Sequence, residues 1–221
     1  MDGAHVRHVQ AVANAGLSTV SDERVVSPGF SGRRRAPAGK LPPGQYVTQD
    51  FPVLSATPTP SIPLESWNFT LTTETGEVRR WNWDEFRALP SAKVTTDIHC
   101  VTRWSKFDTM WEGVAIDTLL EGVETGAQFV MAQSYGGYTT NVPLADLRDG
   151  KAWIAYAYGG KDLEPEHGGP ARLLVPHLYF WKSAKWLSGL VLLREDQPGF
   201  WERLGYNNYG DPWREQRYWG D

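Results

Sequence analysis

The chain has 221 residues, of which 41% are hydrophobic and 22% are charged, as is typical of one soluble globular domain. Its formal net charge of -4 excludes the basic surface that nucleic-acid binding requires, and no apolar run approaches the roughly 20 residues of a membrane-spanning helix. The single cysteine cannot form an internal disulfide, and no apolar leader follows the three arginines at 33–35, so we expect a cytoplasmic protein.

The first part of the chain lacks any hydrophobic period. Residues 1–45 are rich in Gly, Ala, Ser, Pro and Arg, which predicts a flexible or surface-draped arm ending in the breaker cluster "KLPPG". We expect the ordered domain to cover residues 46–221. The prolines within residues 50–60 favour an extended segment over a central strand, because each proline removes a hydrogen-bond donor from the sheet.

Alternating apolar residues then predict a hairpin. The segments 67–72 and 78–81 alternate with a period of two and are separated by "ETGE". A short helix over 85–89 follows, with Asn82 or Asp84 as the capping residue.

The rest of the domain reads as short strands with few helices. Residues 93–101 are rich in β-branched side chains, which predicts a strand ending near the cysteine, and helical spacing predicts a helix over 114–120. Three further strands are predicted at 129–132, 152–157 and 187–193. We expect the tail after Pro198 to wrap the surface without regular structure. This order of elements indicates a mainly β domain with α-helical insertions.

The lone cysteine is the first candidate for chemistry. Cys100 ends a predicted strand beside polar residues, and a single free cysteine is most often a small buried hydrophobe. Alternatively, Arg103 lies close enough in the chain to stabilise an exposed thiolate. Spacing alone favours the inert residue and leaves the thiolate open.

Two other uses of the cysteine have less support. A hydrolase would need Cys100 as nucleophile with His167 or His177 as base and an orienting residue such as Asp162, but triads assemble in space and spacing cannot test them. The adjacent His99 is poorly placed because neighbouring strand residues point to opposite faces. A structural zinc site lacks any C-x-x-C or H-x-x-x-H pair.

Two loops later in the chain suggest an anionic ligand. The segment "HGGPAR" (167–172) offers glycines for close backbone approach, an imidazole and a guanidinium, and "WKSAKW" (181–186) offers two ammonium groups and a hydroxyl. A phosphate-bearing ligand requires such a mixture of donors, although either loop alone is equally compatible with a solvated surface. Together with Cys100 they favour a cofactor held by its phosphate, with the thiolate as a soft ligand to a metal.

Three motifs occur in the order "HCVTRWS…WEGVAIDTLL", "HGGPARLLVP" and "YFWKSAKWL". As an ordered set they resemble the molybdopterin-binding domain of the sulfite oxidase superfamily, and in particular its small stand-alone bacterial members. The resemblance covers essentially the whole chain after the arm. It implies the sulfite oxidase fold, an α+β domain of mainly short strands with a few short helices.

The resemblance also implies a cofactor and its ligands. One molybdenum would be held by a single pterin dithiolene and one cysteine thiolate, which Cys100 matches. His167 and Arg172 match residues that hold the pterin and its phosphate, and Ser134 is similar in placement to a hydroxyl residue near the metal. The other implied pterin contacts are Leu54, Ser55, Ala56, Ser183, Ala184 and Lys185.

The residues after the cysteine bear on the substrate. Relatives that oxidise sulfite carry further arginines here, whereas only Arg103 follows closely, and Trp104 matches a tryptophan of the protein-methionine-sulfoxide reductase relatives. Arg103 would suit an oxyanion, or would pair with Asp97 or Asp108 instead. Tyr135 and Tyr138 are further candidates for the mouth of the site.

We therefore expect a molybdenum-dependent oxidoreductase that transfers an oxygen atom, with Cys100 and Arg103 as its catalytic residues. The substrate would be a small molecule of oxyanion or sulfoxide type. No haem-binding domain is found in the sequence, so a separate redox partner would exchange electrons with the site. A non-catalytic protein that stores or delivers the pterin would use the same loops and is the alternative.

Overall fold

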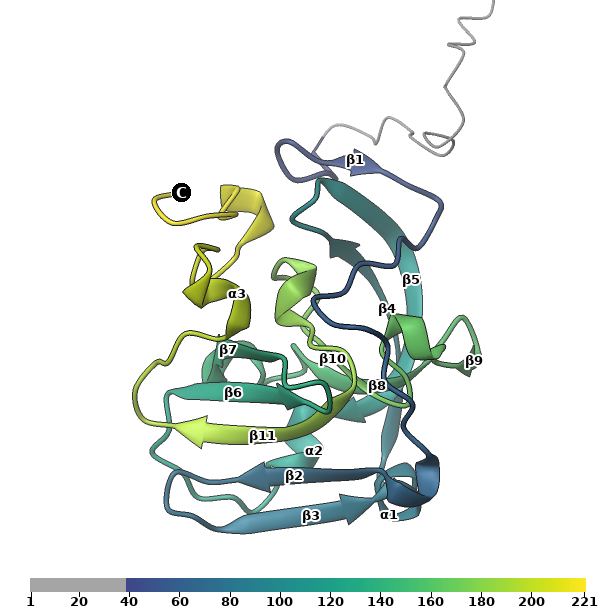
Figure 1. Cartoon of the computed structure of the whole chain (residues 1–221), viewed down its shortest axis with the longest axis vertical. Helices are drawn as coiled ribbons and strands as arrows, with labels where there is room; N and C mark the ends of the chain where they lie inside the picture. Colours follow the sequence, from purple (N-terminus) through teal and green to yellow (C-terminus); the bar gives the residue numbers. More distant parts are fainter. Residues whose placement is uncertain (1–38) are drawn as a thin grey trace, which may run out of the picture. The chain divides into compact units, whose positions relative to one another are not determined.

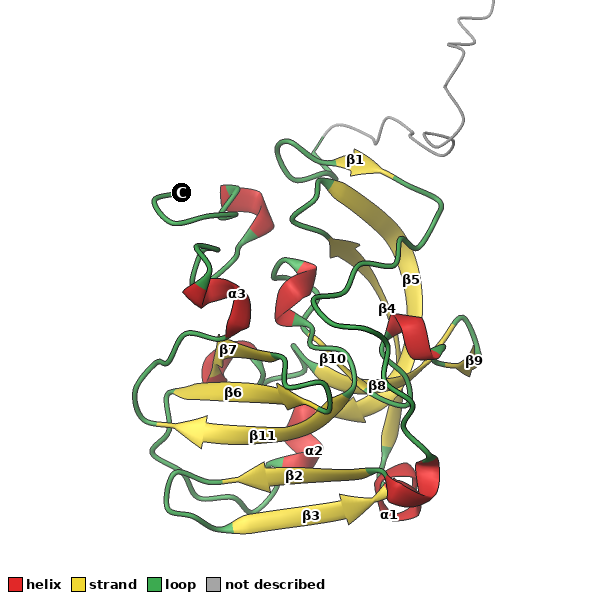
Figure 2. Ribbon diagram, in the orientation of Figure 1, coloured by secondary structure: helices red, strands yellow, loops and turns green. Residues whose placement is uncertain are grey.

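In the computed structural model the chain is described from residue 39 to residue 221, and two β-sheets organise this part (Figures 1 and 2). The predicted arm, residues 1–45, lies outside the described residues except for 39–45. Order has begun by Tyr46, where the first strand starts. None of the described helices is long and apolar enough to cross a membrane.

The first sheet is arranged around one long strand, β5 (Trp104–Ala115). β5 pairs in parallel with β1 and antiparallel with β4 and β8, and β8 pairs in turn with β9 and β10. These strands are β1 (Tyr46–Val47), β4 (Ser91–His99), β8 (Trp153–Tyr158), β9 (Lys161–Asp162) and β10 (Arg172–Leu174).

The second sheet has the strand order β3-β2-β11-β6-β7. β2 and β11 are parallel, and the other neighbours are antiparallel. The strands are β2 (Asn68–Thr72), β3 (Val78–Asn82), β6 (Phe129–Ser134), β7 (Thr139–Pro143) and β11 (Leu187–Leu193). The parallel pair brings the C-terminal part of the domain back beside its first hairpin (Figure 1).

The helices are short. The α-helices are α1 (Trp83–Arg87), α2 (Ile116–Leu119) and α3 (Phe200–Arg203). The 3-10 helices are η1 (Leu64–Ser66), η2 (Leu144–Asp146), η3 (Pro165–His167), η4 (Phe180–Lys182) and η5 (Pro212–Arg214). Asn82 caps α1 through a capping box with Glu85, which confirms one of the two predicted caps.

Two hydrophobic clusters hold the sheets. The larger one joins residues of both sheets, among them Phe69 of β2, Leu190 of β11 and Ile154 of β8, all of which are buried. Each such side chain stabilises the fold by roughly 1.5–3 kcal/mol through its burial. The smaller cluster lies on the first sheet and contains Cys100 and Trp104. The cysteine is thus anchored in packed structure.

The predicted elements agree with the structure in part. The hairpin, the helix after it and the strands at 129–132, 152–157 and 187–193 are confirmed within a few residues. The helix predicted over 114–120 begins two residues too early, because Val114 and Ala115 pair with β8 as the end of β5. β1, β5, β7 and β9 were not predicted.

Candidate functional site

A cleft of about 210 Å³ opens beside Cys100. Five stretches of chain meet around it: the extended segment after β1, the loop of residues 100–104 that joins β4 to β5, the turn between β6 and β7, the chain from β10 to β11, and the tail. The residues that line it are Phe51, Pro52, Leu54, Ser55, Ala56, Thr57, Cys100, Val101, Thr102, Trp104, Tyr138, Arg172, Phe180, Trp181, Ser183, Ala184, Lys185, Trp186, Trp201 and Tyr206.

Residues 100–104, here called the cysteine loop, present the thiol to the cleft. The loop closes through two backbone hydrogen bonds, from Cys100 N to Trp104 O (2.8 Å) and from Arg103 N to Cys100 O (3.0 Å). The Cys100 side chain is 8% exposed, and burial raises the pKa of its thiol. The Thr102 hydroxyl donates to the sulfur at 3.1 Å. Without a metal the thiol is therefore protonated near neutral pH.

Arg172 places a positive charge in the cleft without a carboxylate partner. Its side chain is 1% exposed, and its guanidinium donates to the carbonyls of His167 (2.7 Å) and Ser183 (2.6 Å). Among residues 39–221 no acidic side chain forms an ion pair with it, and burial lowers its pKa. A buried and unpaired cation of this kind favours an anionic ligand.

Lys185 adds a second cation to the same wall. Its ammonium group donates to the Ser55 hydroxyl (2.9 Å) and the Glu166 carbonyl (2.6 Å), which ties the extended segment to the loop before β11. Burial and the nearby Arg172 lower its pKa to about 8. A bound anion would raise that pKa again, because it stabilises the charged form.

His167 supports this wall from behind. Its ring stacks on Phe51, with centroids 4.0 Å apart, and its Nδ1 is buried without a hydrogen-bond partner among residues 39–221. Burial lowers its pKa, and the charges of Lys185 and Arg172 act in the same direction. His167 itself is not among the residues that line the cleft, so it differs in this from the other pterin contacts that the resemblance implied.

Tryptophan and tyrosine side chains of the tail form the opposite wall. Trp201 and Tyr206 stack with centroids 4.9 Å apart, and Trp181 meets Tyr206 edge-on at 5.1 Å. All three line the cleft. The tail is therefore part of the site, and it contains the short helices α3 and η5, which corrects the prediction that it wraps the surface without regular structure.

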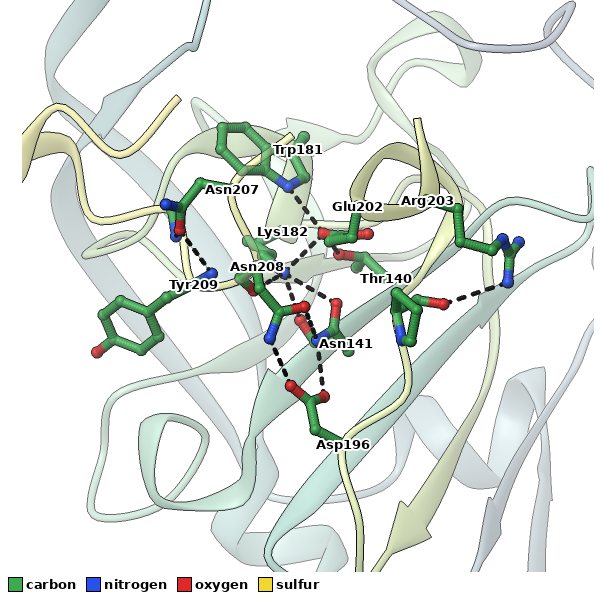
Figure 3. A network of polar contacts seen from close by, with 12 residues as sticks. Thr140, Asn141, Trp181, Lys182, Asp196, Glu202, Arg203, Asn207, Asn208 and Tyr209 are labelled. Atoms are coloured by element: carbon green, nitrogen blue, oxygen red, sulfur yellow. Dashed lines mark hydrogen bonds and ion pairs between the residues drawn. The ribbon is translucent and has the colours of Figure 1, made fainter. Parts of the chain in front are cut away.

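A buried ion pair fastens the tail to the second sheet (Figure 3). The Lys182 ammonium lies 2.6 Å from Glu202 Oε1 and also donates to the carbonyls of Asn141 (2.8 Å) and Asn208 (2.7 Å). Glu202 accepts further bonds from Trp181 Nε1 and the Thr140 hydroxyl. Lys182 is fully buried in this network, so the prediction that it offers its charge to a phosphate was wrong.

The glycines of "HGGPAR" serve chain packing. Gly168 has a positive φ of 108°, and an added Cβ would lie 3.0 Å from Lys185 side-chain atoms. At Gly169 an added Cβ would lie 2.0 Å from the Leu163 carbonyl oxygen. Neither glycine lines the cleft. Their small size is needed where the loop meets neighbouring chain, which corrects the expectation that they admit a ligand to the backbone.

Most of the predicted site residues meet in the cleft. Its lining includes Leu54, Ser55, Ala56, Cys100, Arg172, Ser183, Ala184 and Lys185. Arg103 is exposed outside the lining and forms no ion pair with Asp97 or Asp108 in the described part of the chain. Ser134 is buried outside the lining with an unpartnered hydroxyl.

The other uses considered for the cysteine find no support. In the described chain Thr102 is the one side chain hydrogen-bonded to the sulfur. His99 bonds Ser105 (2.8 Å) instead, and His177 bonds Asp146 (3.2 Å). Within residues 39–221 no three His, Cys, Asp or Glu side chains gather as metal ligands, as a protein-built zinc site would require.

Several lining residues were missed by sequence reasoning. Thr102, Phe180, Trp181, Trp201 and Tyr206 belong to this group. The unusual tryptophan content of the chain, 11 of 221 residues, was a sign that aromatic residues matter. Their spacing in the sequence did not indicate that they form one wall of a cleft.

Comparisons with known proteins identify this arrangement. The family model "Oxidoreductase molybdopterin binding domain" matches residues 56–201. The uncharacterized oxidoreductase YuiH of Bacillus subtilis is 42% identical over 192 residues, which cover 86% of this chain and 97% of that protein.

More distant relatives are larger. The protein-methionine-sulfoxide reductase catalytic subunit of Pseudomonas syringae is 26% identical over 68% of this chain and 50% of its own length. Arabidopsis thaliana sulfite oxidase is 25% identical over 66% of this chain and 47% of its own length. This chain spans about half the length of both. The sulfane dehydrogenase SoxCD structure from Paracoccus pantotrophus shares the fold, with a TM-score of 0.59 at 13% identity over 87% of this chain and 58% of that one. The chain therefore belongs to the oxidoreductase molybdopterin binding domain family, and it is an enzyme whose cofactor is molybdopterin.

Proposed function

We propose that the cleft binds molybdopterin with Cys100 as a thiolate ligand to molybdenum, and that the enzyme transfers an oxygen atom to or from a small uncharged substrate of sulfoxide type. The observation that carries this proposal is the placement in a single cleft of one thiol and two cations that form no ion pair with any described residue. Bound molybdenum supplies two-electron oxygen-atom transfer, which protein side chains cannot perform.

The residues in the cleft fit this cofactor. Arg172 and Lys185 are suited to its phosphate, because both are cationic residues of the lining, form no ion pair within residues 39–221, and have pKa values lowered by burial that a bound anion would raise again. Leu54 is 51% exposed in the wall, and a planar pterin would cover such an apolar side chain. Cys100 offers the soft sulfur ligand that the metal prefers.

The charges of the cleft favour an uncharged substrate. Arg172 and Lys185 are the charged side chains among its lining residues. If the cofactor phosphate occupies them, no lining cation is left for a sulfite-like oxyanion. Around the thiol the lining consists of Val101, Thr102 and aromatic rings, which suit a neutral molecule with an apolar portion. Arg103 lies outside this lining, so we assign it no contact with substrate.

Electrons would come from a separate partner. Reduction of a sulfoxide consumes two electrons and two protons and yields a thioether and water. The donor would be a reduced redox protein or a small carrier, and oxidation of a thioether would run the same balance in reverse.

The test uses protein purified from cells that make molybdopterin. We expect about one molybdenum and one pterin per chain, and sulfoxide reduction with a reduced viologen dye. We expect Cys100→Ser to retain pterin and to lose turnover. Faster oxidation of sulfite with ferricyanide would contradict the assigned substrate, and full cofactor without turnover in either direction would favour the carrier alternative.

A further inference from the structure

Two side chains from opposite ends of the domain hold the cysteine loop. Gln45 precedes the residues that the family model matches, and Arg217 follows them. Both contact backbone carbonyls of residues 100–104. Neither side chain lines the cleft, so both contact the site through the backbone of the loop, and the charge of Arg217 in addition acts to lower the pKa of the Cys100 thiol.

Gln45 binds the two ends of the loop with one amide group. Its Nε2 donates to the carbonyl oxygens of Cys100 (3.1 Å) and Trp104 (3.0 Å), and lies 3.2 Å from the Ser105 hydroxyl. The loop ends are thereby fixed relative to β1, which pairs with the start of β5 at Tyr46 and Trp104. A side chain that only accepts hydrogen bonds cannot replace these contacts, because a carboxylate would face two carbonyl oxygens.

Arg217 binds the middle of the loop and orients Gln45. Its Nη1 donates to the Val101 carbonyl at 2.7 Å, and its Nη2 donates to Gln45 Oε1 at 2.9 Å. The guanidinium also lies 4.9 Å from the centre of the Tyr179 ring. Arginine can reach the two acceptors at once because its planar guanidinium holds two terminal NH₂ groups in a fixed geometry, which lysine lacks.

The Arg217 guanidinium is buried where the C-terminal segment packs against Gly44. The side chain is 6% exposed although Arg217 lies only four residues before Asp221, the last residue of the sequence. Gly44 has a positive φ of 68°, and an added Cβ there would lie 3.3 Å from Arg217 Nη2 and 2.4 Å from Glu215. The left-handed backbone conformation favours glycine at position 44, and the side chains of Glu215 and Arg217 occupy the space where a Cβ would stand. The order of this C-terminal segment is thereby coupled to the cysteine loop.

We infer that Arg217, acting with Gln45, is a positioning residue that fixes the backbone of the metal ligand Cys100 and thereby sets the orientation of its sulfur toward the cofactor. This inference rests on the proposed function for its metal, but the rigidity of the loop can be measured without one. Outer contacts of this kind commonly orient metal ligands in proteins.

The first experiment measures alkylation of Cys100 in cofactor-free protein at one fixed pH. The variants are Arg217→Lys, which keeps the charge and loses the fork, and Gln45→Glu, which keeps the volume and loses the donor. Arg214→Lys, an exposed arginine of the same tail, is the matched control. We expect at least tenfold faster alkylation in the two loop variants, because the thiol reacts when the loop opens, and an unchanged rate in the control. Rates within twofold of wild type in both loop variants would overturn the inference.

The second experiment examines the cofactor-loaded protein. The electron paramagnetic resonance spectrum of partly reduced molybdenum depends on the orientation of the cysteine sulfur. We expect altered g-values in Arg217→Lys and Gln45→Glu and an unchanged spectrum in Arg214→Lys. Identical spectra at full molybdenum content would overturn the inference. Absence of molybdenum from wild-type protein would refute the proposed function, and the alkylation rates would still decide whether the two residues hold the loop.

Discussion

Replacing Lys182 by methionine tests whether the tail is fixed by the buried ion pair. The substitution keeps most of the side-chain length and removes the ammonium group that lies 2.6 Å from Glu202 Oε1. Glu202 would keep its bonds from Trp181 and Thr140, but its carboxylate would stay buried without a cation, and its Oε2 already lacks a hydrogen-bond partner in the described part of the chain. The carbonyls of Asn141 and Asn208 would each lose a donor as well.

The expected loss follows from these groups. Removing one partner of a buried ion pair destabilises a protein by about 3–5 kcal/mol, because the other charge is left uncompensated. For a domain of this size, that corresponds to a fall in Tm of about 6–20 °C. The effect should be partly reversed in Lys182→Met combined with Glu202→Gln, since the second change removes the stranded charge.

Urea unfolding of the cofactor-free protein, followed by tryptophan fluorescence, measures this loss. The matched control is Lys151→Met, an exposed lysine bonded to the Ala145 carbonyl, which should change stability by less than about 0.5 kcal/mol. The reasoning would be refuted if the free energy of unfolding of Lys182→Met lay within about 1 kcal/mol of the wild-type value. It would also be refuted if the loss in the double variant equalled the sum of the losses in Lys182→Met and Glu202→Gln.

Three further predictions concern charge. His99 is buried, and burial lowers its pKa from 6.5 to about 4, so the unfolded chain binds more protons than the folded protein between these two pH values. As the pH falls from 6.5 to 4, the folded protein should therefore lose up to about 3 kcal/mol of stability. Urea midpoints compared across this pH range should show a smaller loss in His99→Gln. Binding of pyrophosphate to the cofactor-free cleft, measured by calorimetry, should weaken as the pH rises through about 8 because Lys185 loses its proton, whereas Lys185→Met should bind weakly throughout without this step. Arg103→Ala should keep kcat/KM for a sulfoxide within about twofold of wild type; a loss of a hundredfold would place Arg103 on the substrate.

Local patterns predicted the elements whose residues alternate clearly. β2 and β3 follow a period of two and enclose a short turn, and β11 is an apolar run that ends where predicted. β5 escaped prediction because Lys106, Asp108 and Glu112 interrupt its apolar residues. Its strand conformation comes from pairing with the preceding strand β4 and with β1 and β8, which lie far away in the sequence.

The site was predictable where it relied on motifs and unpredictable where it relied on distant pairs. Arg172 and Lys185 reach the cleft of Cys100 as the motifs indicated. Lys182 and Lys185 look alike in the sequence, yet only the fold brings Glu202 against the first of them. Arg217 likewise gave no signal, since its acceptors belong to residues more than a hundred positions earlier.

The central claim is that Cys100 binds the molybdenum, and X-ray absorption at the molybdenum edge tests it most directly. One pterin dithiolene and one cysteine supply three sulfur ligands, so wild-type protein should show three and Cys100→Ser should show two, with pterin content retained in both. An equal sulfur count in the two proteins would contradict the account.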